Sequence, residues 1–304
     1  MASSLRSRFW RSVLRKIFME TGLTIQAERL RSIKNSTYHM PFPRSVRVDD
    51  LDVAGLQSVS ITPAGADEKQ VILHLHGGGY VTGSIGAYLM LCIPMAKSLR
   101  TRIILPEYRL APEHPYPAAL DDALKAYRWL LAQGYAGSSI ILSGDSAGGG
   151  LCLATVQALR EAGESLPGAV LCMSPWADLT HSSQSHKDNI QSEVLLRTDM
   201  LRLWASYYAG TADLKDPLIS PVFADFKQFP PLLILVDSGE ILFDDARMVA
   251  ERARAAGVDV TLSVWDGLWH VWPIVGDLVP ESGQAFDEMA LFMSTKLPGT
   301  RLPR

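Results

Sequence analysis

Residues 139–150 read SIILSGDSAGGG, a short apolar run followed by a serine among four glycines. The apolar residues at 139–143 predict a strand that is buried on both faces, and a helix-period pattern begins at Ala147. Gly144–Gly148 therefore form a G-x-S-x-G sequence at a strand-to-helix turn, where the two glycines let strand and helix approach closely. This context predicts that Ser146 is a nucleophile held in a strained backbone conformation.

A second glycine run lies upstream at 77–79, directly after a strand predicted at 71–75. Consecutive glycines leave backbone N–H groups open where any side chain would block approach. In acyl transfer, such groups together with the N–H of Ala147 would stabilise a tetrahedral oxyanion, by about 3 kcal/mol for each donor. A phosphate-binding loop would have Lys and Ser or Thr after its last glycine, whereas Tyr80 follows here. The run therefore favours an oxyanion hole.

A serine nucleophile requires a base. Of the seven histidines, His270 is the one that lies in the loop after the last predicted strand, 260–264. The order serine, acid, histidine along the chain is typical of this class of sheet. We therefore predict that His270 is the base.

The acid should follow the strand predicted at 232–236, where four carboxylates crowd one turn, namely Asp237, Glu240, Asp244 and Asp245. Asp237 is still at the strand end, whereas Asp244 and Asp245 suit the start of a helix. Glu240 lies in the middle of the loop, within possible reach of the histidine. The residues alone leave the identity of the acid open.

From residue 71 onward, short apolar segments alternate with helix-length segments, which predicts a mostly parallel sheet covered by helices. The predicted strands are 71–75, 102–105, 139–143, 169–173, 232–236 and 260–264, and the predicted helices are 118–133, 147–162 and 244–256. Residues 177–231 interrupt this alternation with a polar stretch and then a helix predicted at 198–209. A segment of that length is long for a plain loop and is interpreted as an inserted cap.

The first 34 residues have a net charge of +6, from eight basic and two acidic residues. Apolar residues recur there with the period of an amphipathic helix, at Leu5, Phe9, Val13 and Ile17, with Trp10 and Leu14 beside them. Such a segment has three interpretations: an organelle transit peptide, a helix on an anionic membrane, or a helix that docks its apolar stripe on the rest of the protein. The last is the commonest and is the one we expect.

The composition predicts one globular domain without a polyanion partner. The chain has 304 residues, of which 47% are hydrophobic and 20% charged, and a net charge of −3. These values argue against disorder and against binding of nucleic acid through the overall charge. No apolar run reaches the roughly 18 residues of a membrane-spanning helix, so stable membrane insertion is not expected.

Cysteine and histidine usage favours a cytoplasmic protein without a metal site. The three cysteines, Cys92, Cys152 and Cys172, are far apart and odd in number, which disfavours a disulfide framework or a zinc site. His181, His186 and Asp188 lack the spacing of a metal site. His39, His181 and His186 are expected to be solvated.

Four motifs in combination resemble those of the hormone-sensitive lipase family of esterases. They are His76–Tyr80, Tyr108–Pro115, Gly144–Gly149 and Ser174–Trp176, and the resemblance extends from about residue 40 to residue 296. It implies an α/β fold, the α/β-hydrolase fold, with a mostly parallel central sheet, flanking helices and a helical cap. Residues 46–178 and 217–300 would form the catalytic core, 1–45 an N-terminal cap arm and 179–216 the cap insertion.

The resemblance also implies the catalytic residues. Ser146 would be the nucleophile and His270 the base, with oxyanion donors at Gly78, Gly79 and Ala147. The family pattern Asp-Pro-Leu-x-Asp falls on Glu240–Asp244 and places Glu240 at the acid position, where most members have Asp. Asp237 is the reserve candidate. The resemblance further implies structural roles for 108–109 and 113–114 behind the oxyanion hole, and Asp145 is expected to anchor that loop.

The expected activity is hydrolysis of short- to medium-chain acyl esters, without metal or organic cofactor. Aromatic residues expected to line the substrate pocket are Tyr80, Trp176, Trp269 and Tyr207, with Trp204, Tyr208 and Trp272 as further candidates. A lactone or acetylated-metabolite hydrolase would use the same residues. A small-molecule receptor on the same fold is disfavoured because the receptors of this type lack the histidine. A homodimer is compatible with the sequence.

Overall fold

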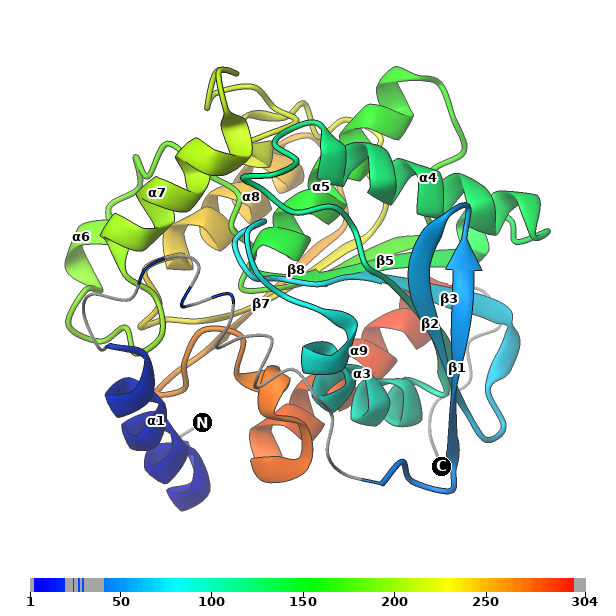
Figure 1. The fold of residues 1–304 in the computed structure, drawn as a ribbon, viewed down its shortest axis with the longest axis horizontal. Helices are drawn as coiled ribbons and strands as arrows, with labels where there is room; N and C mark the ends of the chain where they lie inside the picture. The colour runs from blue at the N-terminus through cyan, green and yellow to red at the C-terminus, as the bar shows by residue number, and fades with distance from the viewer. Residues whose placement is uncertain (1–2, 20–23, 25–26, 28, 30–40, 298–304) are drawn as a thin grey trace.

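The computed structural model describes residues 3–19, 24, 27, 29 and 41–297, and it contains an eight-stranded sheet (Figure 1). The strand order is β1-β2-β4-β3-β5-β6-β7-β8. The strands span Val46–Val53 (β1), Leu56–Pro63 (β2), Asp67–Leu75 (β3), Thr101–Pro106 (β4), Ile140–Asp145 (β5), Ala169–Met173 (β6), Leu232–Asp237 (β7) and Val260–Trp265 (β8). From β4 to β8 all neighbouring strands are parallel, whereas β1, β2 and β4 pair antiparallel. The α/β-hydrolase prediction is confirmed.

Helices cover both faces of the sheet (Figure 1). They span Leu5–Phe18 (α1), Ile85–Leu99 (α3), Ala118–Ala132 (α4), Ala147–Glu161 (α5), Ser185–Asp188 (α6), Thr198–Ala209 (α7), Phe243–Ala255 (α8) and Pro280–Lys296 (α9). Alternate residues of each central strand belong to two separate buried clusters, as in β5, where Ile140 and Leu142 share a cluster with α5 and Ile141 shares the other with α3 and α9. This alternation follows from the two-residue period of a strand.

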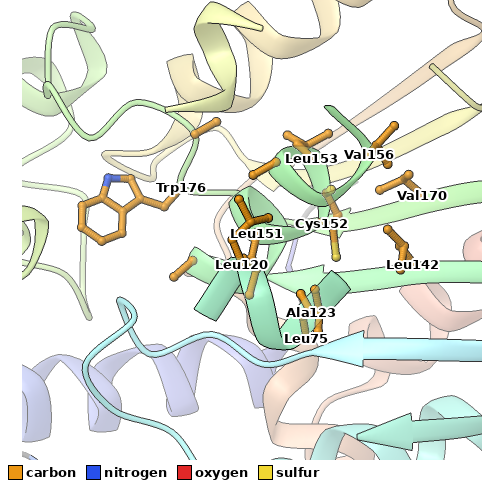
Figure 2. Packing of buried hydrophobic residues seen from close by; sticks show 14 of the residues in the cluster. Leu75, Leu120, Ala123, Leu142, Leu151, Cys152, Leu153, Val156, Val170 and Trp176 are labelled. Atoms are coloured by element: carbon orange, nitrogen blue, oxygen red, sulfur yellow. The ribbon is translucent and has the colours of Figure 1, made fainter. Parts of the chain in front are cut away.

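The packing of α5 positions the start of that helix against the sheet. Figure 2 shows Cys152 and Val156 of α5 beside Leu142 and Val170, which project from β5 and β6. All four side chains are fully buried. Because the interior is close-packed, the turn that leads into α5 has little freedom to move.

The predicted strands and helices are confirmed, and β6 and α7 have the predicted bounds. The other elements agree to within two residues at each end, except that β3 begins four residues earlier than predicted. The hairpin of β1 and β2, and the helices α3 and α9, were missing from the prediction. β1 forms an edge of the sheet, and its residues are partly exposed and include Asp49, Asp50 and Asp52. An edge strand of this composition lacks the continuous apolar run that revealed the central strands.

The predicted N-terminal helix is present as α1, and the expectation that it docks through its apolar stripe is confirmed only in part. Trp10 and Leu14 pack against the core, whereas Leu5 and Phe9 are 81% and 63% exposed. The helix is attached mainly by polar contacts, described below, and these select its orientation. No helix within the described residues is long and apolar enough to cross a membrane.

Candidate active site

Ser146 lies at the turn between β5 and α5 in a strained conformation, with φ 51° and ψ −123°. A positive φ is costly for a residue with a side chain, and such strain persists only where the surroundings impose it. A Cβ on Gly148 would lie 1.9 Å from the carbonyl oxygen of Leu75, so only glycine fits there. The backbone N–H of Ser146 donates to the carbonyl of Met173 at 2.9 Å. The strained serine that the sequence predicted is present.

His270 and Glu240 form a buried pair in the two loops that follow β8 and β7. His270 Nδ1 donates to Glu240 Oε2 at 2.7 Å, and the two residues are 5% and 1% exposed. Burial lowers the pKa of His270, but the hydrogen bond to Glu240 and the charges of Glu240, Glu193 and Asp145 outweigh it. The pKa therefore lies above its usual value of 6.5.

Ser174 connects this pair to the serine turn. Its hydroxyl donates to Glu240 Oε1 at 2.7 Å and accepts a hydrogen bond from the N–H of Val271 at 3.1 Å. The preceding residue, Met173, accepts the N–H of Ser146. Met173 and Ser174 therefore hold the serine turn and the histidine loop at the same edge of the sheet. The sequence analysis assigned Ser174 to a motif but gave it no role of its own. Its position directly after the buried strand β6 is the feature that could have indicated one.

Asp237, the reserve candidate for the acid, has other partners. Its two carboxylate oxygens accept hydrogen bonds from the N–H groups of Gly239 at 3.0 Å and Leu268 at 2.8 Å. Burial is the main cause that raises the pKa of Asp237 to about 6, with the charge of Glu240 contributing. Asp237 thus shapes the two loops, and Glu240 is the residue that the structure brings to His270.

Replacing Ser174 with alanine should lower kcat by about tenfold with little change in KM, because a slightly misplaced histidine loop costs roughly 1.4 kcal/mol of transition-state stabilisation. The loss of a buried partner should also lower the free energy of unfolding by about 1–3 kcal/mol. Steady-state kinetics and urea unfolding measure the two effects. Ser220→Ala is the matched control, because the Ser220 hydroxyl is equally buried and accepts the N–H of Leu179. An equal kcat loss in both variants would contradict a positioning role for Ser174.

The loop 76–80 presents unoccupied backbone donors. In the part of the chain that the structure describes, the N–H groups of Gly78, Gly79 and Ala147 donate to no protein acceptor. Gly78 and Gly79 both have positive φ, 107° and 62°. The arrangement can stabilise negative charge on a substrate oxygen.

Asp145, inside the G-x-S-x-G sequence, fixes this loop. Its Oδ1 accepts the N–H of Gly77 at 3.1 Å and its Oδ2 accepts the hydroxyl of Tyr88 at 2.9 Å. Tyr108 donates to the carbonyl of His76 at 2.6 Å and stacks on its ring, with centroids 4.2 Å apart. The prediction that Asp145 anchors the loop is confirmed, and one pentapeptide supplies both Ser146 and the support of the glycine loop.

In the neighbouring family motif, the structural role expected of Tyr108 and Arg109 is confirmed, whereas Glu113 and His114 are exposed. Arg109 makes two side-chain bonds to the carboxylate of the buried Asp122, each 2.8 Å long, which ties the loop behind 76–80 to α4.

Aromatic residues of α7 lie directly on the glycine loop. A Cβ on Gly79 would lie 2.0 Å from Trp204 of α7, and the rings of Tyr80 and Tyr208 stack 3.7 Å apart. Trp176 belongs to the same buried cluster, and Tyr207 packs against it partly buried. Trp269, by contrast, is buried in the other cluster, on the opposite face of the sheet, as is Trp272.

The expectation that His186 is solvated is wrong, since it is 3% exposed. Its Nε2 lies 3.5 Å from Oδ1 of Asp245, in the first turn of α8. His181 is partly buried beside it, with ring centroids 5.0 Å apart. The polar stretch around His186 packs against the start of α8. The acidic residues at the start of α8 did not by themselves predict this contact. His39 lies outside the described residues.

Comparisons with known proteins agree with this fold. A family model for the α/β hydrolase fold matches residues 72–274. An acetyl-hydrolase of Streptomyces hygroscopicus is 41% identical over 77% of this chain and 78% of its own, and an esterase of Acinetobacter venetianus is 36% identical over 84% of both chains. The crystal structure of an esterase from the bacterial hormone-sensitive lipase family superimposes with a TM-score of 0.92 and 38% identity, covering 98% of this chain and all of the other.

Proposed function

Because this chain belongs to the hormone-sensitive lipase family of α/β hydrolases and is a carboxylic ester hydrolase, we propose that it cleaves short- to medium-chain acyl esters through an acyl-enzyme on Ser146. The observation that carries the mechanism is the buried His270–Glu240 pair, tied through residues 173–174 to a strained serine beside unoccupied N–H donors.

In the proposed reaction, Ser146 Oγ attacks the ester carbonyl carbon while His270 Nε2 accepts the hydroxyl proton. The carbonyl oxygen gains negative charge, which the N–H groups of Gly78, Gly79 and Ala147 stabilise. The carbon–oxygen bond to the alcohol then breaks, and His270 returns the proton to the departing alcohol. Water deprotonated by His270 attacks the acyl-enzyme next, and the carboxylic acid leaves as Ser146 regains its proton. Glu240 orients the imidazole and stabilises its charged form.

The proposed limit on acyl length rests on the aromatic residues that the cap brings to the glycine loop. Trp204 contacts Gly79, and Tyr80 and Tyr208 are stacked and almost fully buried. Tyr80, Trp176 and Tyr207 are proposed to line the pocket, whereas Trp269 is packed in the opposite cluster. Bulky rings this close to the oxyanion donors favour a small acyl group.

Hydrolysis of p-nitrophenyl esters from acetate to palmitate tests this proposal. We expect kcat/KM to be highest for the shorter esters and to fall steeply toward palmitate. Acetylated metabolites and lactones assayed alongside will separate the alternatives that use the same residues. A maximum at palmitate, or no turnover of any ester by folded protein, would contradict the proposed substrate class.

Replacing Trp204 with alanine should shift the preferred acyl length upward, because removing the ring opens space beside Gly79. The ratio of kcat/KM for decanoate to that for acetate should rise by about tenfold, corresponding to roughly 1.4 kcal/mol of added apolar contact. Leu203→Ala is the control, since Leu203 is the preceding residue of α7 and is 44% exposed. An unchanged ratio in the Trp204 variant would mean that the cap does not limit acyl length.

The pH dependence of kcat/KM should report His270. Activity requires the neutral imidazole, and the pKa of His270 is raised, so the acidic limb should lie above the ordinary histidine value of 6.5. Glu240→Gln removes the raising charge and should shift the limb of the residual activity to lower pH, whereas Glu240→Asp should not. The pKa of Asp237 is raised to about 6, so this carboxylate is a second candidate for the acidic limb. An unchanged limb in Asp237→Asn would exclude it. A limb that moves with Asp237 would refute the assignment.

We further propose that residues 1–45 and 179–216 form the cap over a core of 46–178 and 217–300, and that the protein functions in the cytoplasm. The contacts of α7 with the glycine loop support the first point. Three free cysteines support the second, because cysteines without disulfide partners are typical of a reducing compartment.

A further inference from the structure

The orientation of α1 is fixed by polar contacts at two places. At its start, the N–H of Ser4 and the hydroxyl of Ser7 both donate to the carboxylate of Glu281, at 2.6 Å each. Farther along, Arg11 donates to the carbonyl of Ser192, and Arg15 donates to the carbonyl of Gln191 at 2.8 Å. These anchors determine which side of the helix faces the protein and which side faces away.

The side of α1 that faces away combines apolar and basic residues. Leu5 and Phe9, one helical turn apart, are 81% and 63% exposed. Arg6, Arg8 and Lys16 are exposed on the same helix. α1 contains five basic residues and no acidic one, and it lies at the edge of the molecule (Figure 1). An exposed apolar pair among cations is the pattern of a helix that lies in the interface of an anionic membrane.

A surface pocket of about 450 Å³ lies between the anchored side of α1 and the rest of the protein. Arg8, Arg11 and Arg15 line it together with Val194 and Gly267. Within the described part of the chain, Arg11 Nε is buried and has no hydrogen-bond acceptor. Arg11 and Arg15 each use one nitrogen on backbone carbonyls, and their remaining N–H groups, together with those of Arg8, suit the oxygens of a phosphate.

We propose that α1 docks the enzyme on an anionic phospholipid membrane. Leu5 and Phe9 enter the interfacial layer, and the arginine-lined pocket takes a lipid headgroup phosphate. Apolar burial and attraction to anionic lipid add together in such binding, which explains why the two features occur on one helix. The pocket also contacts Gly267, three residues before His270. Docking would therefore place the segment that carries His270 near the membrane, and membrane binding itself does not depend on the proposed reaction.

Co-sedimentation of the full chain with vesicles tests the proposal. We expect binding to vesicles of phosphatidylcholine mixed with phosphatidylglycerol, weak binding to phosphatidylcholine alone, and loss of binding at high salt. The variant with Leu5→Ser and Phe9→Ser should lower the partition coefficient at least about tenfold, and Arg8→Ala should lower it about fivefold. Leu291→Ser is the matched control, because Leu291 is 53% exposed and lies about 15 Å along α9 from Glu281, the residue of that helix that binds α1. Hydrolysis of p-nitrophenyl acetate should be unchanged in all of them.

Four outcomes would overturn the proposal. Equal binding to both kinds of vesicle would exclude recognition of anionic lipid, and binding that survives the double serine variant would exclude docking through α1. Stabilisation by inorganic phosphate that requires Arg8, without vesicle binding, would identify the pocket as a site for a soluble anion. A dimer in sedimentation velocity that the double serine variant dissociates, again without vesicle binding, would identify this side of α1 as a contact between copies of the chain.

Discussion

Replacing Ser146 with alanine should reduce kcat for p-nitrophenyl butyrate by at least about 10⁴-fold, because no other group then forms the acyl-enzyme. The fold should persist, since alanine and serine meet similar strain at φ 51° and differ only in the hydroxyl. Equal midpoints in thermal unfolding would verify this point.

The control for this variant is Ser143→Ala in β5, the strand that leads into the turn of Ser146. Ser143 is fully buried, and its hydroxyl lies 3.2 Å from His74 Nδ1, but it has no part in the proposed reaction. Its loss of kcat should stay below about tenfold. Retention of most activity in Ser146→Ala would show that hydrolysis takes place by another route.

Replacing Glu240 with glutamine should reduce kcat by about 10³ to 10⁴-fold, as expected when the histidine loses the carboxylate that sets its tautomer and stabilises its charge. The matched change Asp237→Asn should cost less than about tenfold in kcat, because Asp237 binds the N–H groups of Gly239 and Leu268 rather than the histidine. Its effect should appear mainly in the free energy of unfolding, at about 1–2 kcal/mol.

Steady-state kinetics of the two variants, measured with the same ester, decides between the carboxylates. Glu240→Asp provides a second control, since it keeps the charge but shortens the side chain and should recover part of the activity. Equal losses in Glu240→Gln and Asp237→Asn would contradict the assignment of the acid.

The sequence predicted the serine turn and the glycine loop because their chemistry is local. The turn that holds the strained serine requires glycine at 144 and 148. At 148 the reason is the carbonyl oxygen of Leu75, which occupies the space that a side chain would fill. The central strands were predictable for a similar reason, since burial on both faces demands a continuous apolar run.

Features that depend on distant residues could not be predicted in this way. Asp237 and Glu240 differ by three positions, and only the loop geometry separates the carboxylate that receives backbone N–H groups from the one that receives His270. The role of Ser174 depends on two loops that meet in space. The orientation of α1 depends on Glu281, far along the chain, and not on the helix's own apolar pattern.

Covalent labelling with an alkyl phosphonate ester tests the central claim most directly, because the reagent forms a stable analogue of the tetrahedral intermediate on an activated serine. We predict one phosphonyl group per chain, located on the peptide that contains Ser146, absent in Ser146→Ala and formed much more slowly in His270→Ala. Labelling of another residue, or equal labelling in the Ser146→Ala variant, would contradict the account.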